Sequence, residues 1–299
     1  MRLSIGPIQY FWERKQVLDF YRKAADSVAD IIYLGEVICS KRRLIKLEDW
    51  VAIGKELRQS GKEVILSSLT LLEAASEVGS VKKLCDNDEF TVEANDVTAI
   101  QLLSTAGKSF VTGPSVNIYN QRSLRLLARK GLMRWVLPVE LGLETLKDLQ
   151  MQRPEGVETE VFALGRLPLA YSARCYTARS HNLPKDDCRF KCLDYPDGRM
   201  LKTQEDQEFL VLNGIQTQSA LTHQVLGQVD ELAALGVDVL RISPQHKGTM
   251  RIVEIFDAAR KQAALVPLEE ELHKLLPLGA CNGYLIEKAG MEYGNPETA

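Results

Sequence analysis

Short runs of β-branched and aliphatic residues recur along the chain, and most are followed by a stretch in which apolar residues have helical spacing. Parallel strands need a long crossover, usually a helix, so this alternation predicts a parallel sheet covered by helices. We expect strands at 3–5, 30–35, 63–66, 90–92, 99–101, 110–111, 134–137, 161–164 and 237–242. We expect helices at 14–29, 47–60, 121–130 and 143–149.

About eight strands separated by helices are enough to close a ring, so the predicted fold class is α/β, a (β/α)8-type or TIM-like barrel. An open doubly wound sheet is the alternative. The gap over 170–236 is longer than the others and holds three of the six cysteines. We therefore expect one barrel domain over 1–299, with 170–236 as a cysteine-bearing insertion and helical segment after the seventh strand.

Composition excludes several classes of protein. A hydrophobic content of 45% is typical of a chain with a large core. The formal net charge of −3 gives no global attraction to nucleic acid or to an anionic membrane, so we expect neither as a partner. The apolar stretches are far too short to span a bilayer, and the first residues do not resemble a secretory signal. These features predict a cytoplasmic protein.

Three cysteines of the insertion, Cys175, Cys188 and Cys192, lie in a stretch that is rich in Arg and Lys and poor in core-forming residues. Structural cysteines are usually buried among aliphatic residues, whereas cationic surroundings lower thiol pKa values and offset the charge of gathered thiolates. This setting favours metal ligation over three incidental thiols.

A zinc ion or a cubane iron–sulfur cluster takes four protein ligands, so a fourth is needed. The candidates are Cys39, Cys85, Cys281 and His181. Cys39 follows a predicted strand, and the loops after barrel strands all gather at one face, which favours it. Cys281 is the second choice. Zinc and iron–sulfur chemistry both remain open, and the presence of a single closely spaced cysteine pair leans towards a cluster.

Six segments, spread in order over nearly the whole chain, together resemble the collagenase-like peptidase family of unassigned catalytic type. They are ADIIYLG (29–35), NIYN (117–120), VELGLE (139–144), EVFALG (160–165), YSARC (171–175) and VDVLRI (237–242). Many members of that family have a His where this chain has Leu164 and a Cys where it has Pro168. The resemblance therefore implies the barrel fold, but we expect no peptidase activity.

Within the family, GEVICSKRR (35–43) and CNGY (281–284) are most similar to a branch that acts in oxygen-independent ubiquinone biosynthesis. That resemblance implies a [4Fe-4S] cluster held by Cys39, Cys175, Cys188 and Cys192. It also implies a heterodimer with a UbiU-like subunit that hydroxylates a ubiquinone precursor without O2. A lipid-carrier protein that presents the precursor is a further expected partner.

Several features stay open at this level. The alternative function is a family member in which a metal, such as zinc, only staples the insertion. No recognisable nucleophile and base pair identifies catalytic residues. Arg174 and Arg189, which lie beside ligand positions, are candidates for tuning the potential of a cluster, with ordinary solvated charges as the alternative.

Overall fold

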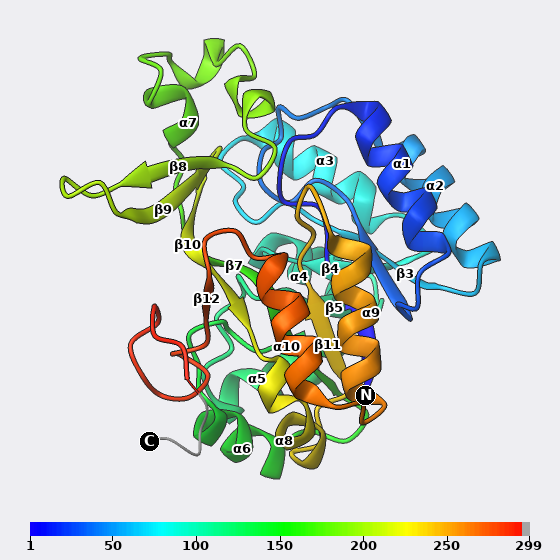
Figure 1. Ribbon diagram of the computed structural model, residues 1–299. Coiled ribbons are helices and arrows are strands. Elements are labelled where there is room, and N and C mark those ends of the chain that lie inside the picture. Colours follow the sequence, from blue (N-terminus) through cyan, green and yellow to red (C-terminus); the bar gives the residue numbers. More distant parts are fainter. Residues whose placement is uncertain (295–299) are drawn as a thin grey trace.

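The computed structural model describes residues 1–294, and its centre is a closed ring of eight parallel strands (Figure 1). Each strand pairs with the next one in the ring, and the eighth strand pairs with both the seventh and the first, which closes the ring. The predicted TIM-like barrel is therefore confirmed. The ring consists of β1 (Arg2–Ile5), β2 (Ile31–Leu34), β3 (Glu63–Ser67), β4 (Thr91–Ala94), β5 (Phe110–Thr112), β6 (Leu132–Val136), β7 (Glu158–Tyr171) and β11 (Val239–Ile242).

Helices connect the strands, and the four predicted helices all form, each beginning at the predicted residue. Within residues 1–294, none is both long and apolar enough to cross a bilayer. The helices are α1 (Arg14–Ala25), α2 (Leu47–Gln59), α3 (Ala75–Cys85), α4 (Val97–Thr105), α5 (Gln121–Ala128), α6 (Leu143–Met151), α8 (Val229–Ala234), α9 (Thr249–Arg260) and α10 (Leu265–Lys274).

The strand predicted at 99–101 is wrong, because these residues lie inside α4. The Asp96 side chain accepts a hydrogen bond from Thr98 N at 2.7 Å and so caps the start of the helix. Ala99, Ile100 and Leu103 are buried, with the spacing of one helix face. The capped start and this spacing outweigh the weak preference of three residues for a strand.

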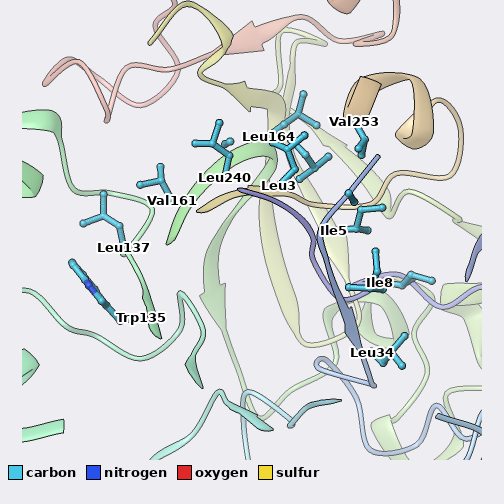
Figure 2. Packing of buried hydrophobic residues seen from close by; sticks show 14 of the residues in the cluster. Leu3, Ile5, Ile8, Leu34, Trp135, Leu137, Val161, Leu164, Leu240 and Val253 are labelled. Carbon is cyan, nitrogen blue, oxygen red and sulfur yellow. The ribbon is translucent and has the colours of Figure 1, made fainter. Parts of the chain in front are cut away.

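The main core lies between the outer face of the barrel and the helices. Leu3 of β1 is in register with Leu240 of β11, which in turn is in register with Val161 of β7. All three side chains belong to the main core cluster, and Figure 2 shows them where the ring closes. Strands of such a barrel are covered on both faces, which is why Ile31–Leu34 is buried without interruption.

The barrel interior holds a buried network of charged groups. The Arg241 guanidinium donates from Nε to Glu160 at 2.8 Å and from Nη1 to Glu93 at 2.7 Å. Ser4 Oγ donates to Glu160 at 2.5 Å. Burial alone would raise the pKa of Glu160, but Arg241 and the other donors outweigh it and hold this pKa below its usual value. Glu160 is therefore a charged residue at the centre of the barrel.

The insertion is built onto a barrel strand. The second half of β7 leaves the ring and pairs antiparallel with β10 (Gln216–Gln224). Two further strands, β9 (Glu208–Asn213) and β8 (Arg199–Lys202), extend this sheet, and α7 (Tyr176–Arg179) precedes them. In Figure 1, β8, β9 and α7 extend away from the barrel at the end opposite the N-terminus. The insertion follows the seventh strand as predicted, but its three strands were not anticipated.

Acid should destabilise the fold through His223 on β10. Burial lowers the pKa of this imidazole from 6.5 to about 4, against a hydrogen bond to the Phe162 backbone. The unfolded chain therefore takes up a proton first, so the stability present above pH 6.5 is lost as the pH falls towards 4. A shift of one pKa unit corresponds to about 1.4 kcal/mol, so we expect the free energy of unfolding to fall by roughly 2 kcal/mol between pH 6.5 and 4.5.

Urea unfolding of the wild type and His223→Gln over this pH range measures the effect. The free energy of unfolding of His223→Gln should depend less on pH than that of the wild type. His273→Gln, which changes an exposed residue of α10, should behave like the wild type. Identical slopes for the wild type and His223→Gln would contradict the assignment.

Candidate metal centre

The four cysteines predicted as ligands come from two regions at the carboxyl end of the barrel strands. Cys39 lies in the loop between β2 and α2. Cys175 precedes α7, and its Sγ accepts a hydrogen bond from Ala178 N at 3.4 Å. Cys188 directly follows a short 3-10 turn, 185–187, and Cys192 lies in a second one, 191–194, before β8. All four are free thiols of intermediate burial.

Electrostatic effects among the thiols show that three of them share one region. Burial raises the pKa of Cys192 to about 11. The Arg42 charge lowers this pKa, whereas negative charge on Cys39 and Cys175 raises it further. Burial likewise raises the pKa of Cys39, against Arg42 and with a contribution from Cys175. Cys39 and Cys175 also pack against the same apolar cluster, which includes Ile38. Thus the β2–α2 loop and the insertion meet at these thiols.

Lys41 joins the Cys39 loop to the turn that ends at Cys188. Its Nζ donates to Asp186 Oδ1 at 2.7 Å and to Lys185 O at 2.9 Å. The pKa of Lys41 is raised, first by the hydrogen bond to Asp186 and further by negative charge on Cys188 and Cys39. Cys188 is thereby linked to the same cationic group as Cys39.

Arg42 is the buried cation of the site. Its Nη1 donates to Gln9 O and its Nη2 to Asn213 Oδ1, both at 2.8 Å. The Arg42 side chain is also 3.6 Å from Glu36 Oε1. Its buried Nε has no hydrogen-bond partner at ordinary distance among residues 1–294, whereas the guanidinium is close enough to Cys192 to lower the pKa of that thiol. A buried positive charge with spare donor capacity thus faces the thiols.

This donor set fits a thiolate-bound metal or cluster in its chemistry, although not in its present arrangement. No three Cys, His, Asp or Glu side chains of residues 1–294 converge tightly enough to hold one metal ion. Four thiols from loops and short turns, beside two cations that would offset thiolate charge, nevertheless form a suitable set. Side-chain rotation in these segments would be needed to bring the sulfur atoms together.

Of the other candidate ligands, Cys281 and Cys85 lie elsewhere in the fold, whereas His181 belongs to the insertion. Cys281 is buried in β12 (Ala280–Cys281) within an apolar cluster that includes Phe162, and burial alone raises its pKa to about 12. Cys85 lies in α3, and its pKa is raised to about 11, chiefly by burial. His181 Nε2 is 3.0 Å from the Tyr195 hydroxyl. The structure therefore separates Cys281 and Cys85 from the thiols near Arg42.

The sequence profile of peptidase family U32 matches residues 16–294. The chain belongs to peptidase family U32. Two solved structures are similar to this U32 chain. The U32 peptidase Mk0906 shares 12% identity, with 82% of this chain and 93% of that chain covered and a TM-score of 0.46. Dihydropteroate synthase from Thermus thermophilus shares 11%, with 86% and 94% covered and a TM-score of 0.43.

Two positions singled out in the sequence, Leu164 and Pro168, have structural roles. Leu164 is fully buried in the core. Pro168 lies in the part of β7 that leaves the barrel, opposite Gln218 of β10. Neither offers a group for acid–base or nucleophilic chemistry.

The cation that acts on the thiol pKa values differs from those singled out in the sequence. Arg174 is exposed, and Arg189 is an exposed residue 3.6 Å from Asp187. Arg42 is instead the main positive charge acting on the pKa values of Cys39 and Cys192. The available signal was the basic run that begins two residues after Cys39.

Proposed function

We propose that this U32 chain is the iron–sulfur subunit of a heteromeric, O2-independent hydroxylase that acts on ubiquinone precursors, similar to UbiV. The observation that supports it is the gathering of free thiols from the β2–α2 loop and the insertion around Lys41 and Arg42. Resemblance of residues 35–43 and 281–284 to the ubiquinone branch supports the choice of pathway.

In this proposal Cys39, Cys175, Cys188 and Cys192 hold a [4Fe-4S] cluster, which when bound supplies one-electron chemistry. Lys41 and Arg42 offset the charge of the thiolates. Glu36 fixes the ligand loop, because its Oε1 accepts hydrogen bonds from Ile38 N at 2.9 Å and Cys39 N at 3.0 Å.

Activity in this proposal requires a UbiU-like partner in a cytoplasmic heterodimer. A lipid-carrier protein would present the precursor, and prephenate is the oxygen donor suggested by analogy with the family. The isolated chain should not hydrolyse peptides.

Metal analysis of anaerobically purified protein, alone and co-expressed with a UbiU-like partner, tests the proposal. We expect about four irons and a similar amount of acid-labile sulfide per chain. One zinc and no sulfide per chain would instead support the alternative function, in which a metal only stabilises the structure of the insertion. A strain that lacks this protein should accumulate an under-hydroxylated quinone precursor under anaerobic conditions. The wild type should correct this defect, and Cys188→Ala should not.

A further inference from the structure

A cavity of about 410 Å³ lies beside the loop that carries Cys39. It is formed by the carboxyl ends of β2 and β3, the start of α2 and the second half of α3. Its volume is in the range of small-molecule sites. One wall consists of Glu36, Ser40 and Arg42 from the Cys39 loop, so an occupant would lie next to the thiols.

The inner surface of the cavity is mainly apolar. Ile45, Trp50, Leu69 and Val81 line it and are almost completely buried. At its floor, Gly35 has a φ of 133°, and a β carbon at this position would collide with the backbone oxygen of Ser67. The glycine therefore lets the ends of β2 and β3 approach each other closely. The result is a preformed apolar pocket with an indole at its side.

The rim of this cavity is cationic. Arg43, Lys46 and Lys83 line it with exposed side chains, and none of them forms an ion pair within residues 1–294. Glu48 is the one exposed carboxylate among the lining residues. Three unpaired cations against one carboxylate give the mouth a positive field, which attracts and orients anions.

We infer that this cavity binds an organic anion with a hydrophobic body, of the alkyl-aromatic carboxylate class. The apolar walls and Trp50 accommodate the ring and alkyl group, while the carboxylate stays at the rim near Lys83 and Arg43. This inference goes beyond the proposed function, because such binding does not require a metal at the thiols.

Tryptophan fluorescence of the purified full chain can detect the binding. The chain has three tryptophans, of which Trp50 lines the cavity. Titration with 4-butylbenzoate should change the emission and saturate, and Trp50→Phe should lose most of this change. The neutral isostere 4-butylbenzamide should bind several-fold more weakly. Equal affinity for the acid and the amide would overturn the assignment of an anion.

Variants of the rim complete the test. Arg43→Gln, Lys46→Gln and Lys83→Gln combined should raise the Kd for 4-butylbenzoate about tenfold at low salt. Ser80→Trp, an exposed lining position on α3, should block the cavity and prevent binding. Lys83→Gln alone should weaken binding, whereas Lys82→Gln, its neighbour outside the lining, should not. Equal effects of Lys82→Gln and Lys83→Gln, or unchanged binding in Ser80→Trp, would overturn the proposal.

Discussion

Cys188→Ala and Cys192→Ala are each expected to reduce bound iron from about four atoms per chain to near zero, as are Cys39→Ala and Cys175→Ala. Each substitution leaves one iron of a cubane cluster without a protein ligand, so we expect the protein to hold the cluster less tightly. The measurement is iron and sulfide content after anaerobic purification, together with the visible absorption of the cluster.

Cys85→Ala and Cys281→Ala are the matched controls, because both thiols are free and buried away from Arg42. Both variants should keep the cluster. Full iron in Cys39→Ala with loss in Cys281→Ala would identify Cys281 as the fourth ligand. The four ligand variants should retain the circular dichroism of the wild type, because none of these four thiols belongs to the main core. A largely unfolded metal-free chain would contradict this.

Glu160→Gln should destabilise the fold by about 3 to 5 kcal/mol, because it leaves the fully buried Arg241 charge without its full compensation. Urea unfolding of the purified variant measures the change in the free energy of unfolding. Glu254→Gln removes a carboxylate from an exposed pair with Arg251 and should cost at most about 1 kcal/mol. Similar losses of the free energy of unfolding in both variants would show that the charged network inside the barrel contributes little to stability.

The barrel could be predicted because its signal is local and repeated. A buried run such as 31–34 followed by a helical pattern requires only neighbouring residues to be recognised. The strand prediction at 99–101 failed because so short an apolar stretch does not distinguish a strand from a helix. The cap at Asp96 starts the helix that these residues form. The strands of the insertion could not be found in this way, because β10 is stabilised by pairing with β7, far away in sequence.

At the candidate site, the approach of Cys39 to the insertion followed from barrel topology, since loops after parallel strands gather at one face. The role of Arg42 could not be derived from sequence. Its burial depends on Gln9 O and Asn213 Oδ1, which accept hydrogen bonds from the guanidinium and lie far apart in the sequence. Charge can be read from a sequence, but the burial of a particular charge depends on contacts that form only in the folded chain.

The closing strand of the ring has a consequence for the order of events during synthesis. Chains emerge from the ribosome amino end first. Cys39 is made early, Cys192 much later, and β11, which joins β7 to β1, later still. All four thiols are therefore available before the ring can close. The native geometry around them depends on β10 and on β7, so iron delivered to the nascent chain would meet ligands that the fold has not yet positioned.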